Sequence, residues 1–278
     1  MTVENQRTKA DTLRALHQDG VLVLPNAWDA GSAALIAAAG APAIATTSAG
    51  VSWALGSADG QQLTREQAVA AIARIADSVR IPVTADIEGG YGPAPEDVAA
   101  TVRAAIDAGA VGINLEDSLA PGGPLHDPAD QAERIRAARR AAEEAGLPGL
   151  FINLRTDVFL FGIGEEKDRL DDVARRAAAY AEAGADGLFV PGLLDLGTLA
   201  ELATRTALPL NVMAGPGAPN VDDLRKAGVR RVSVGSAIAQ AAYGLVRSAA
   251  AELLASGTYA TLHDAVDFGT LNSAFPTD

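Results

Sequence analysis

The sequence repeats one form of punctuation, in which an Ala-Gly pair closes an alanine-rich stretch and an apolar run follows within a few residues. The pairs place glycines at positions 40, 109, 146, 184 and 228, separated by 69, 37, 38 and 44 residues. A glycine directly after a helix adopts the left-handed conformation that other residues resist. An interval near 37 residues matches one strand–helix unit, so the pattern predicts strands and helices in alternation.

Eight short apolar runs accompany this punctuation, as expected for parallel strands that are buried on both faces. The predicted strands are 21–24, 43–46, 82–86, 112–116, 150–155, 187–190, 210–213 and 232–236. The predicted helices between them are 29–39, 64–79, 95–108, 127–145, 170–183, 195–206 and 220–227. A further helix is expected at about 5–19, and another at 238–254.

This alternation predicts an α/β fold of the (β/α)8 TIM-barrel type. We expect a single domain over 1–278, with the N-terminal helix at 5–19 and a C-terminal helical extension at 238–278. The alternative is an open, doubly wound sheet, which would normally carry a GxGxxG turn after an early strand. The segment after the first strand, Leu24-Pro25-Asn26-Ala27-Trp28, has no such turn.

Composition excludes several classes of protein. A hydrophobic fraction of 49% is too high for a disordered chain. The absence of cysteine excludes disulfides, thiolate nucleophiles and cysteine-bound metals. A net charge of −13 argues against nucleic acid as a partner. The long uncharged stretch 30–58 is interrupted by glycines and a proline, and the first nine residues lack an apolar core, so we expect no membrane partner and a cytoplasmic location.

Acidic residues gather where predicted strands end, the place where barrel enzymes carry their reactive groups. Asp86 and Glu88 end the third strand, Glu116 ends the fourth, and Asp59 lies after the second. Asp86 and Glu88 face one side if the extended backbone continues. Such a set predicts a site for Mg²⁺ or Mn²⁺ with several retained waters. The alternative is that each acid caps a helix or pairs with an arginine.

Other strand ends offer groups for an anionic ligand. Arg155 ends the fifth strand and could bind a carboxylate or pair with Asp157 or Glu116. Asn211 could bind an oxyanion or satisfy buried backbone groups. A second set follows the second strand, where backbone N–H groups could approach an anion or form a plain turn: Thr47, Ser48, Ala49 and Gly50.

Few groups could transfer a proton. The three lysines, Lys9, Lys167 and Lys226, fall on no predicted strand end, so a Schiff-base mechanism is not expected. Of the three histidines, only His126 could reach the mouth of the barrel as a catalytic acid or base, on a loop rich in glycine and proline. The alternative is an exposed histidine just before a helix.

Several segments together resemble the isocitrate lyase/phosphoenolpyruvate mutase superfamily, over about 21–243. They are 24–30 (LPNAWDA), Leu55-Gly56 followed by Asp59, 84–92 (TADIEGGYG), 112–117 (GINLED) and 153–157 (NLRTD). The resemblance implies an α/β barrel whose last helix swaps between subunits of a homodimer or homotetramer.

The resemblance also implies a chemistry. It implies Mg²⁺ held partly through water by Asp59, Asp86, Glu88 and Glu116. It implies a small 2-oxo carboxylate or its enolate, bound around 47–50 and by Arg155 and Asn211. Members break or rearrange a C–C or P–C bond beside such an enolate.

Some features depart from the superfamily pattern. Lyases of this type carry a Lys-Lys-Cys-Gly-His loop after the fourth strand, whereas this chain has 118–126 (SLAPGGPLH). The mutases and phosphonate hydrolases place Lys and Asn there, and these are missing as well. We therefore expect a Mg²⁺-dependent enzyme acting on a 2-oxo or 2-hydroxy carboxylate, most readily a C–C lyase. The alternatives are a P–C mutase or hydrolase and a non-catalytic carboxylate-binding protein.

Overall fold

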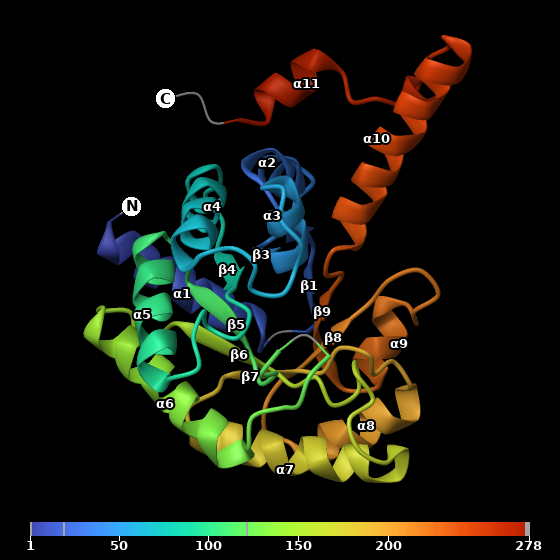
Figure 1. Cartoon of the computed structure of the whole chain (residues 1–278). Coiled ribbons are helices and arrows are strands. Elements are labelled where there is room, and N and C mark those ends of the chain that lie inside the picture. Colours follow the sequence, from blue (N-terminus) through green and yellow to red (C-terminus); the bar gives the residue numbers. More distant parts are fainter. Residues whose placement is uncertain (1, 19, 121, 276–278) are drawn as a thin grey trace.

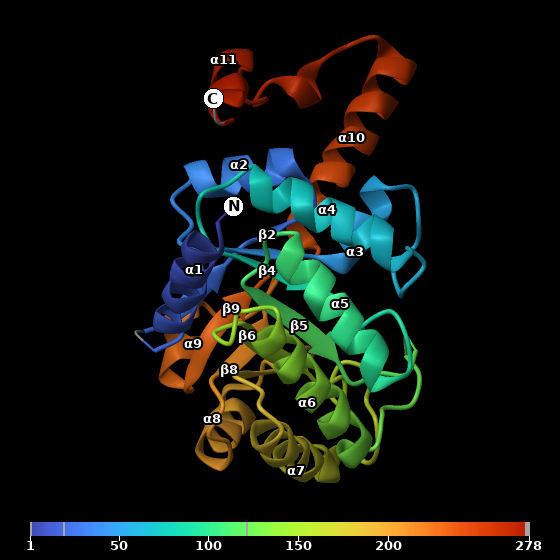
Figure 2. The ribbon, with the colours of Figure 1, turned by 90° about the vertical axis from the view of Figure 1, so that its left-hand side faces the viewer.

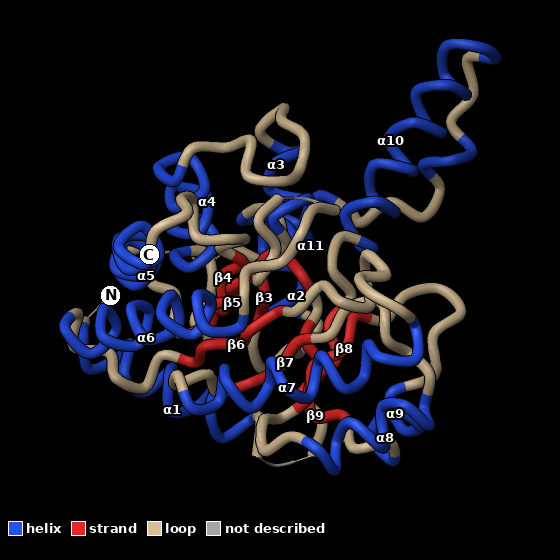
Figure 3. The backbone as a smooth tube through the Cα atoms, turned by 60° about the horizontal axis from the view of Figure 1, so that its bottom comes forward, coloured by secondary structure: helices blue, strands red, loops and turns tan. Residues whose placement is uncertain are grey.

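The computed structural model describes residues 2–18, 20–120 and 122–275. Position 19 of the predicted first helix, position 121 of the loop before His126, and the ends 1 and 276–278 of the predicted domain lie outside the described residues. Within the described part, nine parallel strands form a nearly closed barrel with helices around it (Figures 1 and 3). The predicted (β/α)8-type architecture is confirmed.

The strands, in chain order, are β1 Leu22–Leu24, β2 Asn26–Ala27, β3 Ile44–Thr46, β4 Val83–Asp86, β5 Gly112–Glu116, β6 Phe151–Arg155, β7 Gly187–Phe189, β8 Leu210–Met213 and β9 Val229–Ser233. The helices are α1 Val3–Leu16, α2 Ala30–Ala38, α3 Ser48–Ala54, α4 Arg65–Asp77, α5 Pro95–Asp107, α6 Pro128–Glu144, α7 Arg169–Glu182, α8 Leu196–Arg205, α9 Val221–Lys226, α10 Ala237–Ser256 and α11 Phe268–Ser273. Two 3₁₀ turns, η1 Glu166–Asp168 and η2 Ala260–Leu262, complete the described elements.

The ninth strand arises because the first strand of the barrel continues beyond its predicted end at 24 and is divided into β1 and β2. β1 pairs with β9, whereas β2 pairs with β3 on the other side. Pro25 separates the two pieces, because it has no N–H to donate to a ladder. Its carbonyl still accepts from the Ala45 N–H at 3.4 Å, so the divided strand bridges the two edges of the sheet.

The glycine punctuation is confirmed. All five glycines that follow the Ala-rich helices have positive φ, between 77° and 105°. Each reverses the chain so that the next strand enters the barrel. The predicted bounds of the last strand were wrong: β9 begins at Val229, directly after Gly228 and three residues before the predicted start. β2 and α3 were not predicted, and α11 lies within the predicted helical extension 238–278 without having been predicted as a separate helix.

One end of the barrel is closed by α1 (Figure 2). Leu13 is fully buried, and a Cβ at Gly112 would lie 2.8 Å from its Cδ2. Arg14 donates to the carbonyls of Gly149 and Leu150, the two residues just before β6. The strands therefore begin against α1, and their other ends are left to carry the site.

α10 leaves the barrel as a long helical arm, with α11 beyond it (Figure 1). Large apolar side chains are exposed along it: Ile238, Tyr243, Leu245, Val246, Leu253 and Leu254. The predicted helix 238–254 is confirmed, although it extends from 237 to 256. No helix among the described residues combines the length and apolar character needed to cross a membrane.

Two glycines allow a test of how the loops at the mouth are held. Gly192 and Gly217 both have φ of 85°, but a Cβ at Gly192 would lie 2.8 Å from the Leu160 backbone, whereas a Cβ at Gly217 would meet nothing. We expect Gly217→Ala to cost about 1 kcal/mol through backbone strain alone. Gly192→Ala should cost about 3 kcal/mol, because overpacking adds to the same strain. Denaturant unfolding of both variants measures the difference, and equal losses would contradict the close packing.

Candidate active site

A small cavity opens at the ends of the barrel strands, on the face where (β/α)8 enzymes carry their active sites. Its volume is about 60 Å³. The lining comes from the segments that follow β3, β4, β5 and β6 and from the loop between α3 and α4. The lining residues are Ser48, Asp59, Gly60, Gln61, Glu88, Glu116, Ser118, Ala120, Arg155, Asp157 and Phe161. Five predicted site residues meet here: Ser48, Asp59, Glu88, Glu116 and Arg155.

Four larger hollows lie elsewhere among the described residues, and none of them combines charged groups from the carboxyl ends of several strands. One of about 590 Å³ lies among α2, α3 and α4, and its carboxylate, Asp29, caps α2. Another of about 440 Å³ lies where the strands begin, and its Asp186 is paired with Arg14 and Arg139. The small cavity is therefore the better candidate site.

Asp86 and Glu88 are brought together by a turn. β4 ends at Asp86, and Glu88 has a left-handed φ of 49°, so the extended backbone that the prediction assumed does not continue. Asp86 is not among the lining residues, and it accepts from the backbone N–H of Ser48 and of Glu88, both at 3.3 Å. The Glu88 carboxylate accepts from the Gln61 N–H at 2.5 Å and from the Tyr91 hydroxyl at 3.0 Å. Both carboxylates are thus fixed by donors.

Arg155 lies between two carboxylates. It faces Glu116 in the register of β5 and β6, and its Nη1 donates to Glu116 Oε1 at 2.5 Å. Its Nε donates to Asp157 Oδ1 at 2.6 Å, and Asp157 also accepts from the Ser118 hydroxyl at 2.6 Å. The ion pairs considered from sequence are present, and they fix the guanidinium at the cavity wall.

The site disfavours negative charge. Burial raises the pKa of Asp86, against the opposing field of Arg155. Burial and the neighbouring Asp86 raise the pKa of Glu88 to about 7. Burial also raises the pKa of Glu116, and Asp86 and Asp157 add to that effect against the opposing Arg155. A bound cation would therefore relieve a repulsion that is built into the fold.

The predicted anion-binding run 47–50 forms the start of α3 instead of an open turn. Thr47 is the residue before the helix and is buried, and Ala49 is half-buried; neither lines the cavity. A Cβ at Gly50 would lie 2.7 Å from Trp28 Cβ, so this glycine serves close packing. Only Ser48 of this run reaches the cavity.

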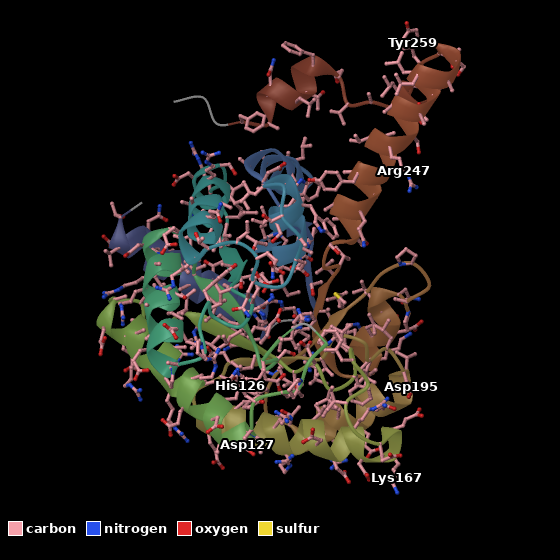
Figure 4. All side chains as sticks on the ribbon, viewed as in Figure 1. His126, Asp127, Lys167, Asp195, Arg247 and Tyr259 are labelled. Atoms are coloured by element: carbon pink, nitrogen blue, oxygen red, sulfur yellow. The ribbon has the colours of Figure 1, made fainter. Side chains whose placement is uncertain are left out.

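Asn211 and His126 do not line the cavity either. Asn211 is buried, donates to the carbonyls of Val212 and Arg231, and accepts from Asn153 within the barrel. His126 lies beside the start of α6 (Figure 4), where its N–H donates to Asp117 and its carbonyl accepts from Arg176. Burial, followed by Arg134, lowers the pKa of His126. Its role as a proton donor stays a prediction.

Sequence reasoning missed other cavity residues. Gln61 has a φ of 57°, and its side chain accepts from the Tyr91 N–H at 3.1 Å. Ser118 and Phe161 line the wall. Ser118 lies two residues after Glu116, a strand-end group that was found, and this spacing could have identified it. Asp157, two residues after Arg155, was considered only as a partner of that arginine.

The donors suit Mg²⁺ in chemical type. Within the described ranges, no three acidic or histidine side chains form a preformed metal cluster. Mg²⁺ characteristically retains several waters and uses only one or two protein carboxylates. The carboxylates around this small cavity suit such a hydrated ion, because they can bind its water molecules without surrounding the ion themselves.

Comparisons with known proteins identify the family of this chain. The model of the family described as phosphoenolpyruvate phosphomutase matches residues 13–254. The chain belongs to the phosphoenolpyruvate mutase/isocitrate lyase superfamily. It is similar to 2-methylisocitrate lyase of Escherichia coli, with 30% identity over 77% of this chain and 74% of that one.

Two further relatives are more similar in sequence. An uncharacterised protein of Mycobacterium tuberculosis is 40% identical over 80% of both chains. A solved structure from Burkholderia cenocepacia, provisionally named a lyase/mutase, is 38% identical with a TM-score of 0.89, over 97% of this chain and 96% of that one. Superfamily relatives are lyases or mutases, which supports an enzyme and leaves its reaction open.

The raised pKa of Glu88 predicts a pH-dependent stability. The pKa of about 7 in the fold, against an ordinary 4.5, means that ionising Glu88 costs the metal-free fold free energy as pH rises. The cost is small below pH 4.5 and reaches about 3 kcal/mol above pH 7. We expect Glu88→Gln to stabilise the protein in EDTA by about 2 kcal/mol more at pH 8 than at pH 5.

The free energy of unfolding in urea at the two pH values measures this gain. Glu144→Gln is the control, because Glu144 is an exposed glutamate on α6. A gain from Glu88→Gln that does not change with pH would contradict the assignment.

Proposed function

We propose that this protein is a Mg²⁺-dependent enzyme that stabilises the enolate of a small 2-oxo or 2-hydroxy carboxylate and breaks a C–C bond beside it. The observation that carries the proposal is the position of Arg155. It is the only cationic side chain among the described residues that line the cavity, and it lies there among four carboxylates.

Arg155 is suited to hold the substrate carboxylate. Its guanidinium has a fixed orientation, because Glu116 and Asp157 each accept from it. A planar fork held in this way can bind a carboxylate through two parallel hydrogen bonds when it exchanges one protein partner for the ligand. The small cavity volume favours a compact acid and leaves little room for bulk water.

The carboxylates supply the second half of the site. We propose that Asp59, Asp86, Glu88 and Glu116 hold Mg²⁺, largely through water. When bound, the ion would supply positive charge against the negative charge that develops as an enolate forms. Asp59 is exposed at the rim, whereas Glu88 is buried, so the ion would lie between solvent and the barrel.

The proton that an enolate needs has few sources in the cavity. The described lining contains no lysine or histidine. Two of the hydroxyl groups at the site donate to its carboxylates: the Tyr91 hydroxyl donates to Glu88, and the Ser118 hydroxyl donates to Asp157. Each of these groups is oriented by a carboxylate and can pass a proton only in concert with it.

A P–C bond mutase or phosphonate hydrolase is the second candidate. The match to the phosphoenolpyruvate phosphomutase family favours it. Both reactions need an arginine and a cation around a small 2-oxo acid. Conversion of phosphonopyruvate to phosphoenolpyruvate would support a mutase over the first candidate, and release of phosphate from it would support a phosphonate hydrolase.

Arg155→Lys is the sharpest test of the site. We expect it to lower kcat/KM for C–C cleavage by about 10²-fold, because an ammonium cannot replace a two-pronged donor. The assay follows release of a 2-oxo acid from a panel of 2-hydroxy dicarboxylates, with Mg²⁺ and with EDTA. EDTA should abolish turnover.

Arg205→Lys is the matched control, because Arg205 is a surface arginine that also pairs with two acids. Activity that survives both Arg155→Lys and EDTA would contradict the proposal. Binding of oxalate without turnover of any substrate would instead support a carboxylate-binding protein.

We also propose a homodimer or homotetramer in which α10 packs on a second copy. The arm projects from the barrel, and Arg247 and Tyr259 mark how far it extends (Figure 4). Leu254 is 87% exposed and Phe268 is 81% exposed. An arm with this much exposed apolar surface needs a partner, and a second copy presents an identical arm and an identical barrel edge.

Light scattering at micromolar concentration should give a mass of two or four chains of 28.3 kDa. Replacing Leu253 and Leu254 together by Asp should reduce that mass toward one chain, because two charges would enter the apolar contact. The control is Asn272→Asp, which adds a charge to the same C-terminal extension. A monomeric wild-type protein would contradict the proposal.

A further inference from the structure

Arg134 on α6 is a buried arginine whose partners are backbone carbonyls. It is 2% exposed, and it takes part in no ion pair among the described residues. Its Nη1 donates to Gly92 O at 3.1 Å and to Pro93 O at 2.6 Å, and its Nη2 donates to Gly89 O. A buried guanidinium is costly unless its donors are used, so this arrangement ties α6 firmly to one segment.

That segment is the turn 88–93, directly after the end of β4. Within it, Glu88 and Tyr91 have left-handed φ values of 49° and 57°, which non-glycine residues adopt at a cost in free energy. Such a conformation persists only when its surroundings hold it. The guanidinium of Arg134 binds three carbonyl oxygens within residues 89–93 and so stabilises this conformation.

Gln131, one turn earlier on α6, extends the connection to the second acid. It is fully buried, and its Oε1 accepts from Arg134 Nε at 3.0 Å. Its Nε2 donates to Glu116 O at 3.0 Å. Gln131 and Arg134 therefore join the backbone of Glu116 to the turn that carries Glu88.

We infer that Gln131 and Arg134 are positioning residues that set the separation of the Glu88 and Glu116 carboxylates, and thereby the affinity for a divalent cation. The inference rests on the proposed Mg²⁺ site. Neither residue lines the cavity, so both act through the backbone. Lysine cannot replace Arg134, because a single ammonium cannot reach three carbonyls and Gln131 together.

The test uses Arg134→Lys in the full-length protein, with Arg136→Lys as the control. Arg136 lies on the same helix and pairs at the surface with Glu133. The first measurement is hydrogen exchange of the amides at 87–92 in EDTA. The second is Mg²⁺ affinity by calorimetry, well below the unfolding temperature.

We expect Arg134→Lys to speed exchange at 87–92 by tenfold or more and to weaken Mg²⁺ binding by about 10- to 100-fold, the usual effect of losing a supporting partner. Arg136→Lys should change neither. A purely structural role would lower the unfolding temperature while leaving Mg²⁺ affinity unchanged, and that result would overturn the inference.

Gln131→Met is the second variant, for use if Arg134→Lys does not fold. It removes the link to Glu116 and leaves the three carbonyl bonds of Arg134. We expect weaker Mg²⁺ binding with little change in exchange at 87–92, and unchanged binding would overturn the inference. If the wild-type protein binds no Mg²⁺, the proposed function fails; the exchange measurement on Arg134→Lys then decides separately whether α6 holds this turn.

Discussion

Repulsion among carboxylates is the constraint on which the rest of this structure depends. Four acidic side chains and one arginine line a cavity of about 60 Å³, and Asp86 binds the backbone N–H of the lining residue Ser48. Burial raises the pKa of Asp86, Glu88 and Glu116, and neighbouring carboxylates raise the pKa of Glu88 and Glu116 further. Replacing some of these carboxylates by neutral side chains would remove the repulsion and stabilise the fold. Their presence together therefore indicates a functional site.

The helices outside the barrel hold the repelling groups in place. α6 reaches inward with Arg134, and α7 does so with Arg176, which binds the buried Asp117 together with Tyr180. Asp117 in turn accepts from the Asp157 N–H. Both arginines act on the backbone or on buried acids beneath the cavity. The outer layer of the barrel thus does more than cover the sheet, because it fixes the loops that the site needs.

The sequence predicted the barrel because its signals are local, whereas much of the site depends on tertiary contacts. A glycine after each helix and an apolar run after each glycine need no knowledge of the rest of the chain. The acids at strand ends were found because parallel strands finish at one edge. Asn211 and Gly50 were assigned to the ligand, but the fold directs one into the barrel interior and packs the other against Trp28. Gln61 was missed because nothing local marks its left-handed backbone.

Polar and charged side chains in the barrel interior also act on the acids of the site. Barrel interiors are usually filled by branched apolar side chains, but here Asn114, Asn153 and Asn211 join by hydrogen bonds, and Arg231 donates to Asn114 at 3.2 Å. Burial lowers the pKa of Arg231 to about 10, against the favourable field of Asp86, so the side chain is still charged at neutral pH. The attraction between Arg231 and Asp86 is mutual. The acids at the mouth therefore lie near one cation at the cavity wall, Arg155, and near another within the barrel, Arg231. The proposed hydrated cation would approach them from the opposite, solvent side, where Asp59 is exposed.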